Sequence, residues 1–391
     1  MPNSVEKLKP RSRPLINPLP SLPPLLSFFS GAGFLDLGMI NAGFKIVWSQ
    51  EIDARISEVH DFGMTSFFKI EKYTSKPPLI TSQESIDSKQ SGRIRKEAFG
   101  TLSHGDHFGI VGGPPCPDFS IGGKNRGGEA ERGRLTRIFV ERICELNPSF
   151  FLLENVKGLV NTRKHCEFLF QQIANLEENG YAVDFALLNA LDSGVAQDRE
   201  RLFVVGVRRG LVRKMYARNL HKGERAWFPW PRNEKYYGAK FKYHWPTKIP
   251  FGSTPPEPSG IPPELFVGSL IIDQEEMRRL PNGTEAFNPY SKKFYEILEG
   301  DVSRKSFKRL HRFRYSPTVA YGNNEVHLHP VLPRRLTVRE AMRIQSVPDS
   351  FILPKDMPLS LKFKIVGNGV PVRLAQEVGL AIRRFITGET C

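Results

Sequence analysis

Cysteine is scarce in this chain, with 4 among 391 residues, and none of the four forms a Cys-x-x-Cys pair. No Cys/His cluster has the spacing of zinc ligands, so the sequence predicts no metal site. Few, scattered cysteines are typical of proteins from a reducing compartment. A disulfide scaffold and a zinc module are therefore both disfavoured.

Long apolar runs are missing, and acidic residues are outnumbered. No run is long enough to span a bilayer, and the proline-rich residues 1–24 lack the apolar core of a signal peptide, so we expect no membrane partner. The 56 Lys and Arg against 41 Asp and Glu give a net charge of +15. This excess favours a polyanionic partner such as nucleic acid, although a basic enzyme without such a partner has the same balance.

What the chain does contain is an alternation of strand-like and helix-like runs. Apolar strand-like runs occupy residues 25–29, 44–53, 108–113, 148–156, 181–190 and 201–209. The alternation predicts an α/β fold with a mostly parallel sheet covered on both faces. The chemically notable residues follow the carboxyl ends of these strands, where open α/β sheets bind ligands.

The composition changes near Gly210 and changes back near residue 330. Between these points Pro, Trp, Tyr, Lys and Arg dominate, and order returns at "RRLTVREAMRIQ", where Thr337 and Glu340 have capping-box spacing. We expect a flexible arm, a first part of an α/β domain, an inserted loop-rich domain that grips the substrate, and a C-terminal completion of the α/β domain. Their respective bounds are 1–24, 25–209, 210–330 and 331–391.

A glycine turn follows the first strand. In Phe29-Ser30-Gly31-Ala32-Gly33, backbone N–H groups are free to meet a ligand. Glu51 ends the next strand about twenty residues on, where a carboxylate binds ribose hydroxyls. The pair favours an adenosyl-type cofactor, against the alternative of a tight turn and a solvated acid. No P-loop lysine follows the glycines, which argues against a nucleotide triphosphatase.

Cys116 stands on a stiff turn, "GGPPCPDFS", followed by a stretch rich in Gly, Lys and Arg. Two prolines forbid a helix there, and nearby cations lower the pKa of a thiol. A glycine-rich loop beside the thiol suggests a lid. We interpret Cys116 as a nucleophile rather than as a small buried side chain.

Two further motifs carry charge at strand positions. Glu154 ends an apolar strand, where a carboxyl can have a raised pKa and donate a proton; the alternative is an acid stabilised by a helix N-terminus. "QDRER" places Gln197, Arg199 and Arg201 at alternate positions, on one side of a strand, facing anionic or carbonyl partners. The alternative is an exposed edge strand.

In this order the motifs resemble the DNA (cytosine-5)-methyltransferase family. The likeness runs through FSGAG, GGPPCPDFS, ENV, QDRER, RRLTVREAMRIQ and GNGVP, over about residues 25–208 and 333–386. It implies a Rossmann-like, S-adenosylmethionine-dependent fold with a target-recognition domain in the variable middle. It also implies methyl transfer to C5 of a flipped cytosine in a specific double-stranded DNA sequence through a covalent cysteine intermediate.

The resemblance implies a role for each matching residue. Cys116 is the expected nucleophile, Glu154 contacts cytosine N3 and the amine, Arg201 holds O2, and Arg199 positions neighbouring groups. The expected cofactor contacts are Phe29, Gly31, Gly33, Glu51, Ile52, Asp87, Pro115, Asn368 and Val370, with Asp106 as the rival of Asp87 for the adenine amine. The expected DNA contacts are Ser120, Gln197, Thr318, Val319, Tyr321, Asn323 and Asn324.

The compact size and single variable region imply a bacterial restriction–modification enzyme. We expect a monomer in the cytoplasm, associated with the nucleoid and linked functionally to a restriction endonuclease. Methylation of tRNA and a non-catalytic DNA-binding role on the same fold are the alternatives; the intact Cys116, Glu154 and Arg201 argue against the second. The chain departs from the family pattern at Phe34, often glycine, and Pro117, often glutamine, and neither change removes a reacting group.

Overall fold

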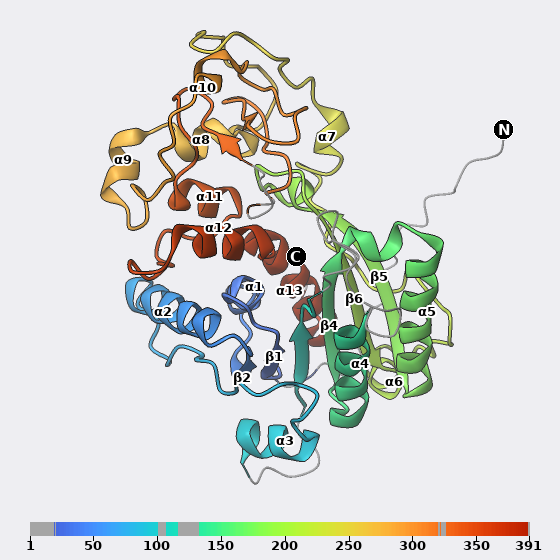
Figure 1. Ribbon diagram of the computed structural model, residues 1–391. Helices are drawn as coiled ribbons and strands as arrows, with labels where there is room; N and C mark the ends of the chain where they lie inside the picture. Colours follow the sequence, from blue (N-terminus) through green and yellow to red (C-terminus); the bar gives the residue numbers. More distant parts are fainter. Residues whose placement is uncertain are drawn as a thin grey trace, which may run out of the picture.

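The centre of the molecule is a six-stranded sheet. The computed structural model describes residues 19, 21–100, 107–115, 133–319, 321 and 326–389, and the account below concerns these. The strand order is β2-β1-β3-β4-β6-β5, and β6 runs antiparallel to both of its neighbours while the others are parallel (Figure 1). The strands are β1 Leu25–Phe28, β2 Ile46–Gln50, β3 Gly109–Gly112, β4 Phe150–Val156, β5 Tyr181–Asn189 and β6 Glu200–Arg208. The predicted α/β fold with a mostly parallel sheet is confirmed.

Strand residues alternate between two hydrophobic cores, one on each face of the sheet. In β4, Phe150 and Leu152 join one core, whereas Phe151 and Leu153 join the other, because successive side chains of a strand point to opposite faces. The core that holds Phe150 contains residues of α1 (Phe34–Asn41), α2 (Ala54–Ile70) and α13 (Val372–Thr387). The opposite core contains residues of α3 (Ser91–Phe99), α4 (Arg134–Leu146) and α5 (Arg163–Glu178).

The C-terminal helix returns to the beginning of the fold. A Cβ atom added at Gly38 of α1 would lie 2.3 Å from the Cβ of Ala375 in α13, and one added at Gly379 would lie 2.8 Å from the Cβ of Ala42. Only glycine permits this close approach of the two helices. The last helix thus covers the unit that carries the glycine turn.

The middle of the chain has little regular structure. It holds the short helices α7 (Ala239–Lys242), α8 (Val267–Ile271), α9 (Gln274–Arg279) and α10 (Lys293–Glu296), and the two-stranded pair β7 (Lys308–Arg309) and β8 (His327–Leu328), at the top of Figure 1. The helix α6 (Arg209–Tyr216) precedes it. The rings of Trp227 and Phe228 lie 5.5 and 5.6 Å from that of Phe385 in α13. This packing favours a domain boundary after residue 230, later than the composition suggests.

Two helices lie between the middle region and α1 and α2. The first, α11 (Val338–Ile344), begins with the predicted capping box of Thr337 and Glu340, which is confirmed. The second, α12 (Leu359–Asn368), is not evident from the sequence, because lysines and a glycine interrupt its apolar pattern. Within the described ranges, no helix has both the length and the apolar character needed to cross a membrane.

Candidate active site

A buried ion pair marks the carboxyl end of β4. The Nε of Arg201, near the start of β6, lies 3.1 Å from Oε1 of Glu154, and both side chains are 11% exposed. Strand register explains the meeting, because Arg201 pairs with Val156, two residues beyond Glu154. Side chains two residues apart in a strand share one face of the sheet.

Burial raises the pKa of Glu154, and the nearby guanidinium groups of Arg201 and Arg199 offset this only in part. A carboxyl group in this setting retains its proton to higher pH than a solvated glutamate. Glu154 is thus suited to donate a hydrogen bond or a proton to a bound ring. Arg201 beside it supplies a fixed positive charge.

The Gly-Pro-Pro segment passes directly over Glu154. A Cβ added at Gly113 would lie 2.8 Å from Oε2 of Glu154. Asn155 donates a hydrogen bond of 3.5 Å from its Nδ2 to the carbonyl of Pro114, a contact that the motif alone did not indicate. The described segment ends at Pro115, and the expected nucleophile Cys116 and phosphate contact Ser120 lie outside the described residues.

Arg199 and Gln197 are tied into the protein interior. Arg199 donates hydrogen bonds of 2.8 Å to the carbonyls of Val319, Gly367 and Gly369. Gln197 donates to the carbonyl of Ile344 at 3.1 Å and accepts from the N–H of Val319 at 3.1 Å. Both are buried, which favours a role in joining the parts of the chain over direct contact with DNA.

The alternative of an exposed edge strand for "QDRER" is wrong. The strand β6 lies between β4 and β5, and it begins at Glu200, so Gln197 and Arg199 precede it. Of the three residues expected on one strand face, Arg201 alone meets Glu154 in an ion pair within the described chain. The motif therefore contains one residue that pairs with Glu154 in the candidate site and two residues that connect segments.

The glycine turn and the end of β2 are joined through Glu51. Its Oε2 accepts the N–H of Gly31 at 3.1 Å, and its Oε1 accepts the N–H of Asp53 at 2.9 Å. Phe29, Gly31 and Gly33 have φ angles of 53°, 55° and 86°, in the left-handed region. The N–H groups of Phe29, Ser30, Gly31 and Gly33 are all taken by hydrogen bonds within the protein, so the expectation of several N–H groups free to meet a ligand is not met.

The surroundings of the turn fit an adenosyl-type cofactor. A Cβ added at Gly31 would meet only the carbonyl oxygen of Phe29, at 3.9 Å, so the backbone has an open side. Ile52, next to Glu51, is an apolar side chain left 59% exposed, as a residue that stacks on a ring would be. A carboxylate that can accept hydrogen bonds, an exposed apolar side chain and a glycine without a side chain in the way therefore stand close in the chain, as an adenosyl group requires.

The other expected cofactor residues lie in three segments. Asp87 forms an ion pair with Arg134 at the start of α4, whereas its rival Asp106 lies outside the described residues. Asn368 is exposed at the end of α12, and Val370 is buried. A Cβ at Gly369, between them, would lie 2.2 Å from the ring of Phe34. The ring of Phe34, which stands where the family often has glycine, therefore packs directly against Gly369.

The expected DNA-contact stretch is only partly exposed. Thr318 is exposed, and its Oγ1 donates to the carbonyl of Asp198 at 2.7 Å. Val319 and Tyr321 are buried, and the ring of Tyr321 lies 5.2 Å from that of Phe363 in α12. Their burial favours a supporting role, while Asn323 and Asn324 lie outside the described residues.

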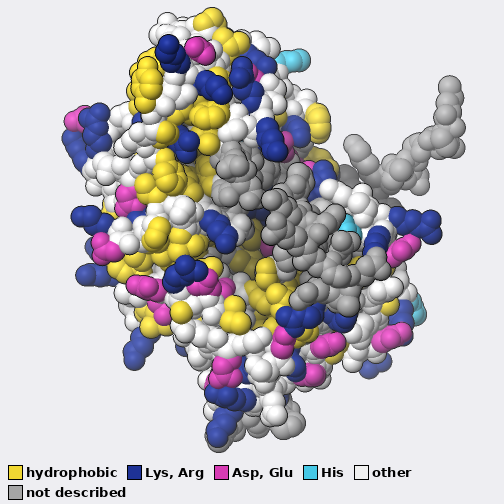
Figure 2. All heavy atoms as spheres, in the orientation of Figure 1, with side chains coloured by type: hydrophobic (Ala, Val, Ile, Leu, Met, Phe, Trp, Pro, Cys, Tyr) yellow, Lys and Arg dark blue, Asp and Glu magenta, His cyan; other side chains and the backbone are white. Residues whose placement is uncertain are grey.

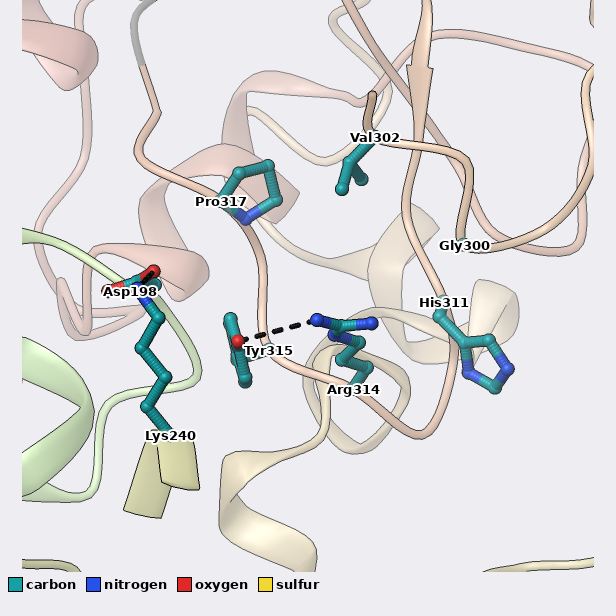
Figure 3. Close-up of a pocket in the computed structure, with 8 residues that line it drawn as sticks. All are labelled: Asp198, Lys240, Gly300, Val302, His311, Arg314, Tyr315 and Pro317. Carbon is teal, nitrogen blue, oxygen red and sulfur yellow. Dashed lines mark hydrogen bonds and ion pairs between the residues drawn. The ribbon is translucent and has the colours of Figure 1, made fainter. Parts of the chain in front are cut away.

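A pocket of about 240 Å³ lies between this stretch, α7 and the loop before β6 (Figure 3). It is lined by Asp198, Lys240, Gly300, Val302, His311, Arg314, Tyr315 and Pro317. Lys240 pairs with Asp198 at 2.7 Å. Arg314 donates long hydrogen bonds to the Tyr315 hydroxyl at 3.4 Å and the Pro246 carbonyl at 3.5 Å, and has no carboxylate partner among the described residues.

The basic run before Arg314 is otherwise engaged in internal contacts. Arg309 is buried and donates to main-chain carbonyls, including that of His329 at 2.7 Å. Arg312 pairs with Glu299 at 2.7 Å. Figure 2 shows Lys and Arg side chains spread over the visible face rather than gathered in one patch. The composition of this run could not indicate that Arg314, unlike its neighbours, lines a pocket and lacks a carboxylate partner among the described residues.

The fold and site together define a Rossmann-like methyltransferase. The features that do so are the sheet with its glycine turn, Glu51 directly after β2, and the Glu154–Arg201 pair. Two solved structures share this fold. The S. pombe Dnmt2 methyltransferase aligns with a TM-score of 0.58 and 11% identity over 93% of this chain and 99% of its own. A Spodoptera frugiperda DNMT2 variant aligns with a TM-score of 0.55 and 15% identity over the same two shares.

The sequence comparisons establish the family. The family model for C-5 cytosine-specific DNA methylases matches residues 24–384, and the chain belongs to that family as a DNA (cytosine-5) methyltransferase. It is 40% identical to the type II methyltransferase M.NmeDI of Neisseria meningitidis serogroup C, over 93% of this chain and 84% of the relative. It is 32% identical to M.FnuDI of Fusobacterium nucleatum, over 93% and 95%.

Proposed function

We propose that this enzyme transfers a methyl group from S-adenosylmethionine to C5 of a cytosine flipped out of a specific double-stranded DNA sequence. Its relatives are type II methyltransferases, which supports a role in protecting DNA from a partner restriction endonuclease. The observation that carries the proposal is the buried Glu154–Arg201 pair beneath the Pro-Pro turn that leads to Cys116.

The protein's own groups account for activation of the ring. The thiolate of Cys116 forms a bond to C6, and the electrons of the C5–C6 double bond make C5 nucleophilic. Glu154 donates its proton or a hydrogen bond at N3, and Arg201 stabilises O2 as negative charge develops. S-adenosylmethionine supplies the methyl group to C5. Loss of the C5 proton to a base then restores the double bond and expels the thiolate.

The cofactor site that we propose consists of the Phe29–Gly33 turn, Glu51 and Ile52. Glu51 keeps lone pairs free beyond those that accept Gly31 and Asp53, so it can bind the ribose hydroxyls. Ile52 offers its exposed side chain to the adenine ring. Asp87, Pro115, Asn368 and Val370 complete the proposed set.

The DNA contacts that we propose come from the middle region. Thr318 is exposed beside the pocket that Arg314 and Lys240 line, and two cations there face one acid, Asp198. Such a pocket suits a backbone phosphate. We assign sequence choice to the stretch that includes Thr318, Asn323 and Asn324.

The decisive experiment uses a DNA duplex that carries 5-fluorocytosine in the target site. The fluorine cannot leave as a proton does, so the wild type should form a stable covalent adduct, and Cys116→Ser should form none. Tritium transfer from labelled cofactor should be found on duplex DNA and not on tRNA. An adduct that persists in the serine variant, or transfer to tRNA alone, would overturn the proposal.

A further inference from the structure

A buried histidine lies directly beneath the glycine turn. His60, in α2, has no exposed side-chain surface, and a Cβ added at Gly33 would lie 2.9 Å from its Cδ2 atom. Its Nε2 lies 3.2 Å from Oδ2 of Asp36, and its Nδ1 lies 3.1 Å from Oδ1 of Asp61. Each ring nitrogen therefore faces a carboxylate oxygen.

The contact with Asp36 leads to the glycine turn. Ser27, in β1, donates from its Oγ to Oδ1 of Asp36 at 2.6 Å. Ser30, the second residue of the turn, donates from its Oγ to that of Ser27 at 2.9 Å. The side chains of Ser27 and Asp36 are buried, so no water competes for these bonds. The orientation of His60 is thus coupled to the turn through two hydroxyls and a carboxylate.

The contact with Asp61 leads to the other half of the proposed cofactor site. Oδ1 of Asp61 also accepts the N–H of Ile80 at 2.7 Å. Two residues later, the carbonyl of Ser82 accepts the N–H of Glu51 at 3.1 Å. His60 therefore stands between the glycine turn and the segment that supports Glu51.

With both carboxylates ionised, only one charge state of the ring satisfies both contacts. A neutral imidazole carries a single N–H, whereas the imidazolium donates from both nitrogens. Burial lowers the pKa of His60, but the hydrogen bonds to Asp36 and Asp61 outweigh burial, and the pKa lies above its ordinary value of 6.5. These two carboxylates, from α1 and from α2 itself, are the charged groups that act on the ring.

We propose that His60 is a positioning residue that holds the Phe29–Gly33 turn and the Glu51 segment in the shape that binds the cofactor, as an imidazolium held between two carboxylates. The inference rests on the proposed cofactor site. Because the pKa of His60 is raised in the folded protein, the imidazolium stabilises the turn and the Glu51 segment at low pH, and this stabilisation is lost as the pH rises through the pKa of His60. Cofactor affinity should decline over the same range.

The test measures the affinity of S-adenosylhomocysteine by calorimetry between about pH 6.5 and 9. The wild type should bind about tenfold more weakly at the upper end. His60→Gln should bind about tenfold more weakly than the wild type at the lower end and show little pH dependence, with KM for the cofactor raised and kcat changed less than twofold. His221→Gln, a change at an exposed histidine, is the matched control and should leave the wild-type profile unchanged.

A spectroscopic readout is independent of whether the variant folds. The ring ¹⁵N signals of His60 in the wild type should report two protonated nitrogens at about pH 6, below the ordinary pKa of histidine. A neutral ring at that pH, or a wild-type affinity and pH profile in a folded His60→Gln protein, would overturn the inference. The Glu51→Ala variant distinguishes failure of this inference from failure of the proposed cofactor site. Unchanged cofactor affinity in Glu51→Ala would overturn the cofactor site. Weakened affinity in Glu51→Ala together with wild-type affinity in His60→Gln would overturn only the role of His60.

Discussion

Burial shifts the pKa values of both Glu154 and Arg201, because each side chain is largely removed from water. The ion pair of 3.1 Å keeps both side chains oriented. The pKa of Glu154 is raised mainly by burial, so its proton survives to higher pH than that of an ordinary glutamate. A carboxyl group can thus serve a proton-donating role that a solvated one would not.

Glu154→Gln should lower kcat by about 100-fold or more, because an amide cannot transfer a proton. The wild-type rate should fall as pH rises through the raised pKa of Glu154, and the glutamine variant should lack that limb of the profile. Steady-state methyl transfer over a pH series measures both effects. Retained cofactor binding controls for folding, and an unaltered pH profile in the variant would contradict an acid role.

Arg314→Gln should weaken duplex binding by about threefold to tenfold and reduce the slope of log affinity against log salt by about 1, as for loss of one phosphate contact. The reason is that its guanidinium lines the pocket without a carboxylate partner in the described chain. Arg304→Gln is the matched control, since Arg304 is paired with Asp301 at 3.3 Å. Equal salt slopes for the two variants would rule out a special role for Arg314.

At the scale of elements, the contact between α1 and α13 joins the first helix of the fold to the last. Both helices use glycine where they cross, at Gly38 and Gly379, and the crossing has no room for a side chain. The helix α1 begins directly after the glycine turn. A disturbance at this crossing is therefore transmitted to the proposed cofactor site.

Gly38→Ala should lower the free energy of unfolding by about 1–3 kcal/mol, because the added methyl overpacks the crossing. Gly92→Ala in α3 is the control: nothing lies within 4 Å of its added Cβ, and alanine there should raise the free energy by up to about 1 kcal/mol. Urea denaturation of both variants provides the comparison. A Gly38→Ala protein as stable as the wild type would show that α13 can shift away.

At the scale of the whole molecule, two regions of different character share one chain. The α/β body has the candidate active site, one core and most of the other core, which extends to Val267, Ile271 and Leu310 of the middle region. The loop-rich middle region supplies most of the lining of the pocket around Arg314. Gln197 and Arg199 connect them, through the main chain of Val319 and through Gly367 and Gly369. The middle region is thus anchored to the segment that leads into β6, the strand that carries Arg201.

Exchange of residues 231–330 for the equivalent region of a related type II methyltransferase should transfer the methylation pattern. The boundary follows the packing of Trp227 and Phe228 on α13, which leaves residues up to 230 with the α/β body. Bisulfite sequencing of DNA from cells expressing the chimera reads the pattern. An active chimera with the original pattern would assign recognition to another part of the chain.

The sequence by itself determined the strand–helix alternation, the α/β class, the capping box of α11 and the order of the motifs, because each depends on neighbouring residues. The resemblance gave Arg199 and Arg201 different roles, but residue spacing alone did not show that Arg201 meets Glu154 whereas Arg199 binds carbonyls more than a hundred residues away. Nor could it show that His60 lies between Asp36 and Asp61. Only the tertiary structure decided these roles, because burial and ion pairing depend on which distant segments the fold brings together.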